Sequence, residues 1–189
     1  MQRRTLSVLA ALAAALPLAT QADTMDYSFV DLGYVDTELD DIDVDGDGFA
    51  LRGSIAFLEN FFAFAEYEDL GFDFGVDVTQ FNVGVGGHMP LNEKIDLVGR
   101  FGIVKADLEA DRFGVEADED GFTLGARLRG QVMPRFELEG GFDYVDVDSG
   151  DDTSIVLEGR YFFMDTLSGG ARLAFGDADT IGVGMRLTF

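Results

Sequence analysis

The sequence contains no cysteine and no tryptophan, and only 3 prolines and 1 histidine. Without cysteine, the chain forms no disulfide, thiolate metal site or iron–sulfur cluster. Basic residues are also scarce, because 13 Lys and Arg stand against 36 Asp and Glu, which gives a net charge of -23. A polyanion of this strength repels nucleic-acid phosphates, which excludes a nucleic-acid-binding protein.

Glycine and phenylalanine are abundant instead. The chain has 24 Gly and 18 Phe among its 189 residues, and 47% of its residues are hydrophobic. So many carboxylates would favour disorder in a polar chain, but this apolar and aromatic content predicts a folded protein. The length predicts a single domain.

The first 22 residues have the pattern of a secretory signal peptide. Arg3 and Arg4 precede an apolar stretch from Leu6 to Leu18, and Thr20-Gln21-Ala22 supplies small residues for cleavage. An uncleaved membrane anchor is the alternative, but the apolar stretch is short for a spanning helix of about 20 residues. We therefore expect residues 1–22 to be a cleaved signal peptide and residues 23–189 to be one mature domain.

The rest of the chain alternates between apolar and polar residues. At the C-terminus, one face collects the apolar side chains of Ile181, Val183, Met185, Leu187 and Phe189. A period of two indicates a β-strand with one apolar face. The same pattern predicts an all-β fold of about ten strands, with eight as the alternative. Their expected boundaries are 27–35, 49–58, 61–70, 77–89, 95–106, 121–132, 135–147, 153–163, 167–176 and 179–189.

The direction of the apolar face separates two architectures. In a soluble sandwich the apolar face points inward, whereas in an outer-membrane barrel it faces lipid and the polar face lines the lumen. An even strand count, the alternation of short with longer connections, and the composition of the polar face favour the barrel. The sequence therefore predicts a single transmembrane, antiparallel, up-and-down β-barrel, and a secreted sandwich is the alternative.

The predicted polar face carries nearly equal numbers of positive and negative residues. Seven are basic: Arg52, Arg100, Arg127, Arg129, Arg160, Arg172 and Arg186. Eight are acidic: Asp31, Glu66, Glu68, Asp96, Glu137, Glu139, Asp143 and Glu158. Such a balance in so acidic a chain indicates a narrow lumen, because a buried charge is costly unless it is paired.

Most of the remaining acidic residues fall between the predicted strands. We expect these segments to be extracellular loops: 36–48, 69–77, 107–120, 146–152 and 177–179. On the apolar face, aromatic residues fall near both ends of the strands, as they do in the girdles of outer-membrane barrels. They are Phe57, Phe61, Phe136, Tyr161, Phe163 and Phe189 at the short turns, and Tyr34, Tyr67 and Tyr144 at the other end.

The signal peptide, the alternating strands and the C-terminus together resemble bacterial outer-membrane β-barrels. Phe189, with Leu187 and Met185 at alternate positions before it, is similar to the signal that the barrel-assembly machinery recognises. More narrowly, the chain resembles a small barrel family labelled "sulfation-dependent quorum factor". The similar segments are 29–35, 48–57, 80–86 and the closing strand.

This resemblance implies a porin-like protein in the outer membrane of a Gram-negative bacterium, but it implies no particular activity. The implied partners are outer-membrane lipid and lipopolysaccharide, together with the assembly machinery and periplasmic chaperones during biogenesis. We expect a monomer.

The sharpest local motif is acidic. Asp41, Asp43, Asp45 and Asp47 alternate along the chain, with Gly46 at the turn, as in a loop that wraps Ca²⁺. Arg52 occupies the position of the expected bidentate Glu, so we expect either weak, millimolar calcium binding or a solvated acidic loop. We predict no other cofactor.

The single histidine, His88, is expected near a periplasmic turn as a lumenal or turn residue. We predict no catalytic residues and no enzyme. Two functions remain open. One is a narrow porin-like or structural barrel with a charge-balanced lumen. The other is a surface protein whose acidic loops bind divalent cations, lipopolysaccharide or a cationic partner.

Overall fold

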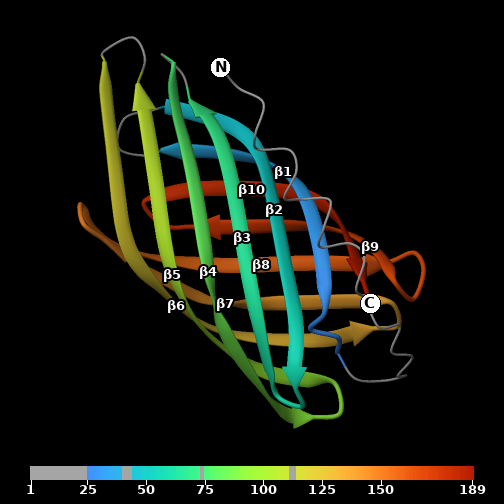
Figure 1. Ribbon diagram of the computed structural model, residues 1–189. Coiled ribbons are helices and arrows are strands. Elements are labelled where there is room, and N and C mark those ends of the chain that lie inside the picture. The colour runs from blue at the N-terminus through green and yellow to red at the C-terminus, as the bar shows by residue number, and fades with distance from the viewer. Residues whose placement is uncertain (1–24, 40–43, 73–74, 111–113) are drawn as a thin grey trace.

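The computed structural model describes residues 25–39, 44–72, 75–110 and 114–189, which form a closed antiparallel barrel (Figure 1). Each strand pairs with its neighbours in sequence, and β1 closes the barrel against β10. No helix in these ranges is long and apolar enough to cross a membrane. The strands are β1 (Phe29–Leu39), β2 (Val44–Leu58), β3 (Phe61–Phe72), β4 (Val76–Asn92), β5 (Ile95–Ala110), β6 (Val115–Met133), β7 (Phe136–Val147), β8 (Gly150–Phe162), β9 (Leu167–Phe175) and β10 (Ala178–Thr188).

The prediction of ten strands in an antiparallel barrel is confirmed, and the eight-stranded alternative is wrong. The residues that alternate between apolar and polar in the sequence also alternate between exposed and buried in the barrel. In β1, the outward Leu32 is 58% exposed, whereas the inward Asp31 is 3% exposed. Successive side chains of a strand point to opposite faces, so the polar face of the sequence becomes the interior of the barrel.

The strands reach further than the sequence predicted at the end opposite the short turns. The segment expected as a loop over 107–120 is largely the paired ends of β5 and β6, with Asp107 opposite Asp118 and Glu109 opposite Glu116. Residues 36–39 and 44–48, and residues 146–147 and 150–152, likewise belong to paired strands. Their acidity suggested loops, but small and apolar residues such as Leu108 and Ala117 keep the period of two that the ladder requires.

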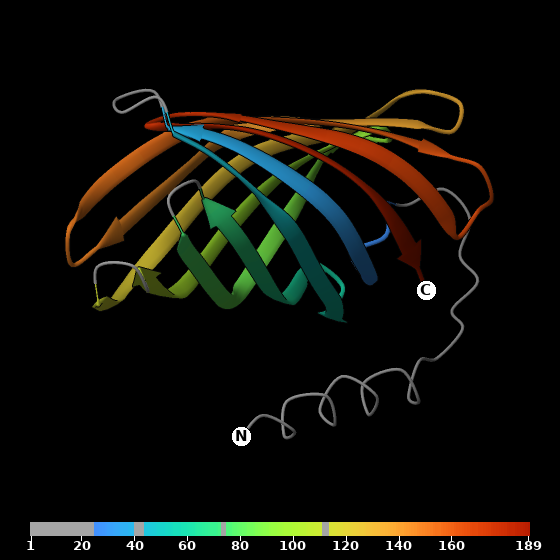
Figure 2. The same cartoon turned by 90° about the horizontal axis from the view of Figure 1, so that it is seen from above.

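The barrel is flattened, with one curved wall of β8, β9, β10 and β1 facing another of β2 to β5 (Figure 2). Aromatic rings of β3 extend into the space between the walls. The Phe64 ring lies over Gly84 and Gly102, where an added Cβ would come within 2.7 and 3.2 Å of its Cζ atom. Phe62 lies over Gly86 in the same way. These glycines of β4 and β5 leave room inside the barrel for the large side chains of the nearby strand β3.

Candidate functional site in the barrel interior

The charged residues predicted for the lumen lie on the inward face of the barrel, buried or half-buried. Each of the seven arginines lies within 3.4 Å of a carboxylate. Seven of the eight acidic residues take part in these pairs, and the eighth, Asp96, lies 3.1 Å from His88 Nδ1. Removing charges from water is costly, and this pairing offsets the cost.

Four of these residues form a closed ring, which we call the seam ring: Asp31 of β1, Glu158 and Arg160 of β8, and Arg186 of β10. Arg160 lies 3.0 Å from Asp31, and Arg186 lies 3.2 Å from Asp31 and 3.1 Å from Glu158. Arg160 also pairs with Glu158. Every charge in the ring therefore has two partners of opposite sign, which suits groups that are almost fully buried.

The remaining pairs lie along the other strands. Arg127 donates to Glu139 at 2.8 Å and also pairs with Asp143. Arg172 reaches the same Asp143 at 3.4 Å, which is the longest ion-pair distance in the interior. Three shorter pairs complete the set: Arg52–Glu68 at 3.2 Å, Arg100–Glu66 at 2.6 Å and Arg129–Glu137 at 2.7 Å. Of the seven arginines, Arg172 therefore has the most distant carboxylate partner.

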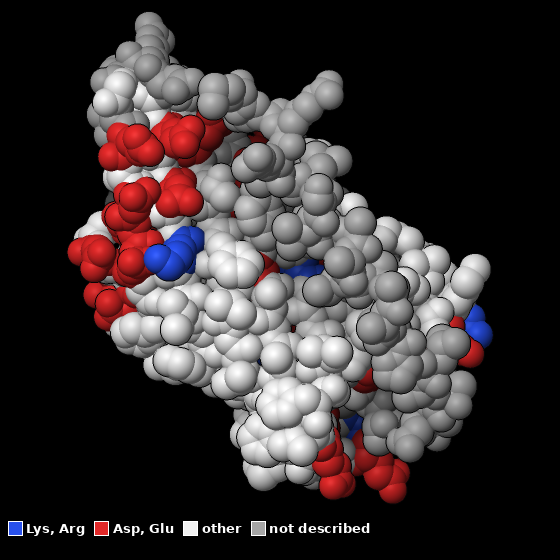
Figure 3. All heavy atoms as spheres, in the orientation of Figure 1, with Lys and Arg blue, Asp and Glu red and all other residues white. Residues whose placement is uncertain are grey.

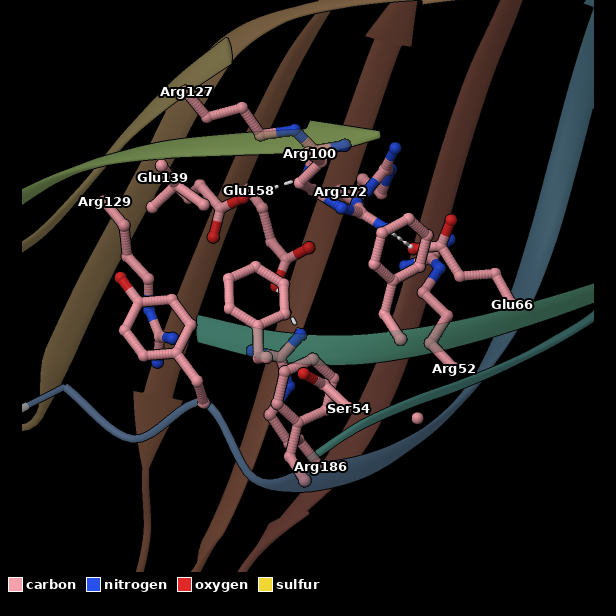
Figure 4. A pocket seen from close by; sticks show the side chains of 16 residues that line it. Arg52, Ser54, Glu66, Arg100, Arg127, Arg129, Glu139, Glu158, Arg172 and Arg186 are labelled. Atoms are coloured by element: carbon pink, nitrogen blue, oxygen red, sulfur yellow. Dashed lines mark hydrogen bonds and ion pairs between the residues drawn. The ribbon is translucent and has the colours of Figure 1, made fainter. Parts of the chain in front are cut away.

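A cavity of about 50 Å³, which we call the central cavity, lies among these side chains (Figure 4). Arginines from both walls converge on it, and Arg100 lies with its guanidinium 4.0 Å from the centre of the Phe64 ring. A second cavity of about 20 Å³ shares Arg52, Glu158 and Arg172 with the first. The charged residues of the central cavity are Arg52, Arg100, Arg127, Arg129, Arg172, Arg186, Glu66, Glu139 and Glu158.

The end of the barrel with the short turns is filled by Tyr27. Its ring stacks on His88 at 4.1 Å and on Phe62 at 5.1 Å, and its hydroxyl donates to Asp96 at 2.9 Å. Burial raises the pKa of the Tyr27 hydroxyl above its ordinary value, so the group stays protonated and can donate. Arg129 lies over the same ring at 4.8 Å.

Tyr27 is a residue whose role the sequence did not indicate. The alternating pattern placed it in the first strand, over 27–35, but β1 begins at Phe29. The segment before β1 turns inward, where the Asp26 carbonyl accepts a hydrogen bond from Arg129 at 2.9 Å. His88, predicted as a lumenal or turn residue, lies inside beside Tyr27 and Asp96.

The candidate calcium motif is only partly described. Asp41 and Asp43 lie outside the described residues, whereas Asp45 and Asp47 lie in β2 and point outward. Asp47 accepts a hydrogen bond from the Tyr34 hydroxyl at 2.9 Å. Among the residues with described positions, no group of three or more His, Asp or Glu side chains is placed to hold a metal ion. Calcium binding stays a prediction.

Two other predictions also stay untested. The signal peptide of residues 1–22 lies outside the described part of the chain. The residues predicted as an assembly signal lie at the end of the chain, where Met185 and Leu187 point outward from β10 and the Phe189 amide donates to the Ser28 carbonyl at 3.1 Å. Its recognition by assembly machinery is a matter for experiment.

Acidic side chains gather on the outer surface at one end of the barrel, and an uncharged surface separates them from a smaller acidic group at the other end (Figure 3). Several of them stand directly opposite one another on paired strands: Asp36 and Asp47, Asp107 and Asp118, Glu109 and Glu116, and Asp146 and Asp151. Like charges in this arrangement repel and destabilise the pair. Lys105 offsets one of the acids, since its Nζ lies 2.7 Å from Asp120.

Comparison with two solved structures supports the fold. The chain is similar to the NanC porin, with a TM-score of 0.57, 9% identity, and coverage of 85% of this chain and 100% of that chain. It is also similar to the translocator domain of the autotransporter NalP from Neisseria meningitidis, with a TM-score of 0.50, 12% identity, and coverage of 88% and 89%. Ail, the attachment invasion locus protein of Yersinia pestis, aligns with a TM-score of 0.47, 16% identity, and coverage of 87% and 100%.

No curated protein matches the sequence. The likeness to the quorum factor family is likewise not tested, and it stays a prediction. A family model does match, over residues 5–158, and its description is outer membrane protein beta-barrel domain. The match covers most of the chain and agrees with the closed barrel that the structure shows. The chain therefore belongs to the outer membrane protein β-barrel domain family.

Proposed function

We propose that the protein is a narrow, porin-like channel of the outer membrane whose passage is closed at rest by its own ion pairs. The observation that carries this proposal is that side chains fill most of the barrel interior. Paired charged side chains extend inward from both walls, and the central cavity between them measures about 50 Å³. A ten-stranded barrel is only slightly wider than an eight-stranded one, whose interior side chains fill.

Apolar side chains fill the interior toward the end with the short turns. Tyr27, Phe62, Phe64 and Val98 form a buried cluster, and all four also line the central cavity. A solute that crosses the barrel must displace this cluster and separate ion pairs. Leaving one partner of a buried pair alone costs about 3–5 kcal/mol, so only water or small ions are expected to pass without a rearrangement.

Single-channel current in a planar bilayer tests the proposal. The refolded protein should give small, brief current steps. The double variant Arg127→Ala/Glu139→Ala removes a facing pair from the cavity and should give larger and longer steps. The variant Glu93→Ala/Lys94→Ala removes one acid and one base from an exposed turn, and serves as the matched control. Large, stable steps from the unaltered protein would contradict a closed resting state.

A second function is favoured by the facing carboxylates on the outer surface at the end of the barrel opposite the short turns, which we call the acidic end. Four directly opposed acidic pairs are unfavourable unless cations neutralise them. We propose that this surface gathers divalent cations and through them holds anionic lipid such as lipopolysaccharide. Binding to lipopolysaccharide vesicles with and without Mg²⁺ tests this. Asp36→Asn/Asp107→Asn should weaken Mg²⁺-dependent binding, whereas Glu59→Asn/Asp165→Asn, at the other end, should not.

A further inference from the structure

The wall of the central cavity differs in charge from the rest of the protein. The whole chain carries a net charge of -23, but six arginines and only three glutamates line this cavity (Figure 4). The carboxylates that complete several of the pairs, Glu68, Glu137 and Asp143, are not part of its lining. The surface that faces the empty space is therefore cationic.

The glutamates of the wall are already engaged. Glu66 accepts from Arg100 at 2.6 Å with one oxygen and from the Asn82 amide at 3.2 Å with the other. Glu158 accepts from Arg186 at 3.1 Å and also pairs with Arg160. Little of their acceptor capacity remains for the donors that face the cavity.

Two donors around the cavity have no acceptor, and a third has only a distant one. Within the described residues, the Ser54 hydroxyl and the Arg100 Nε are buried and lack a hydrogen-bond partner. Ser54 is only 7% exposed, and both residues line the central cavity. Arg172 lines both cavities and makes only the 3.4 Å contact with Asp143. Buried donors without partners are uncommon, so this group calls for an acceptor that is not a protein side chain.

We propose that the central cavity is a binding site for a small, multiply charged oxyanion of the phosphate or sulfate class. Guanidinium groups bind such oxygens in pairs, and Arg52 and Arg172 stand at the cavity with the Ser54 hydroxyl. A tetrahedral oxyanion offers several acceptors in a small volume, which suits a cavity of about 50 Å³. This site goes beyond the proposed channel and does not depend on conduction.

Isothermal titration of the refolded protein in a neutral detergent with inorganic phosphate tests the site. EDTA is added so that cations at the acidic surface recruit no phosphate, and sulfate should compete. Arg172→Gln should lower the association constant by about tenfold or more, since it removes a charge-assisted hydrogen bond. Glu139→Gln removes a negative charge from the wall and should raise the association constant severalfold.

Lys94→Gln is the matched control, because it removes the same charge from an exposed turn and should leave phosphate binding unchanged. Circular dichroism establishes that each variant is folded. If Arg172→Gln fails to fold, Glu139→Gln tests the proposal instead. A rise in its phosphate association constant supports the site, and a fall overturns it. The proposal is overturned if phosphate shows no saturable binding, which would mean that water alone satisfies the donors. It is also overturned if Lys94→Gln weakens binding as much as Arg172→Gln does.

Discussion

The middle of strand β5 and its C-terminal end place polar and apolar residues on opposite faces. Along the middle of β5, Phe101 and Ile103 point outward and are 49% and 55% exposed, while Arg100 points inward. A few residues later, Lys105, Asp107 and Glu109 point outward, while Leu108 and Ala110 occupy the inward positions. The period of two never changes, but the polarity of its two faces is exchanged.

The exchange shows that the surroundings decide which face is apolar. Where lipid surrounds the barrel, apolar side chains face outward and charges pair inside. Where water surrounds it, the acids point outward, and the inward positions are taken by Ala110, which is buried, and Leu108, which is 36% exposed. Tyrosines mark the boundary, since the hydroxyls of Tyr34, Tyr67 and Tyr144 donate to nearby Asp47, Asp69 and Asp146 at 2.9, 3.2 and 3.1 Å. Tyrosine favours such interfaces because its ring is apolar and its hydroxyl is polar.

The largest expected effect comes from breaking an ion pair inside the lipid-embedded region. Arg160→Ala leaves Asp31 and Glu158 each with one partner fewer, and should lower the free energy of unfolding by about 3–5 kcal/mol. Urea unfolding in lipid vesicles measures it. Lys105→Ala breaks the exposed pair with Asp120 beyond the boundary, and should leave the unfolding midpoint almost unchanged. Equal losses of unfolding free energy in the two variants would contradict the difference between the lipid-embedded and water-facing regions.

The second-largest effect is expected from a new charge on the outer surface, which should be costly in the lipid-facing middle of β5 and tolerated at its water-facing end. Phe101→Arg puts a charge on the apolar outer face and should cost about 2–4 kcal/mol of unfolding free energy if the site lies near the bilayer midplane. Asp107→Arg, six residues later on the same face, should be tolerated, because it also places opposite charges across from each other at Asp118. The same unfolding assay measures both. A larger loss for Asp107→Arg would place the boundary elsewhere.

A smaller effect is expected from relieving the repulsion at the acidic end. Asp107→Asn removes one charge of a facing pair and should stabilise the barrel by about 0.2–1 kcal/mol at low salt. The gain should shrink as salt rises, because salt screens exposed charges. Unfolding at two salt concentrations measures this. A stabilisation that does not depend on salt would mean that repulsion is not its cause.

The smallest expected effect concerns the calcium motif. Changing Asp41, Asp43, Asp45 and Asp47 to Asn should abolish any rise in unfolding midpoint that millimolar Ca²⁺ produces. Changing Asp148, Asp151, Asp152 and Asp177 to Asn removes the same charge from the start of β8 and from two connections at the same end of the barrel, and is the control. If both sets reduce the calcium response equally, the effect belongs to total charge rather than to the motif.

The sequence was most informative where one property repeats. The period of two was sufficient to find ten strands and to assign Arg127 and Glu158 to the polar face. It did not identify partners, because pairs such as Asp31 and Arg186 are 155 residues apart and meet only when the barrel closes. The extended strands were missed because acidic residues occur both in loops and on water-facing strands. Tyr27 was missed because an apolar residue before a strand fits the alternating pattern equally well.

The seam ring has a consequence for how the barrel is made. Asp31 lies in the first strand, and its partner Arg186 lies three residues from the end of the chain. A chain that stops before β10 has an open sheet edge and also loses Arg186 as a partner of Asp31 and Glu158, inside a membrane. Both defects are costly. The last strand thus completes the backbone pairing and the charge neutralisation together, so a chain without β10 should be much less stable in the bilayer than the closed barrel.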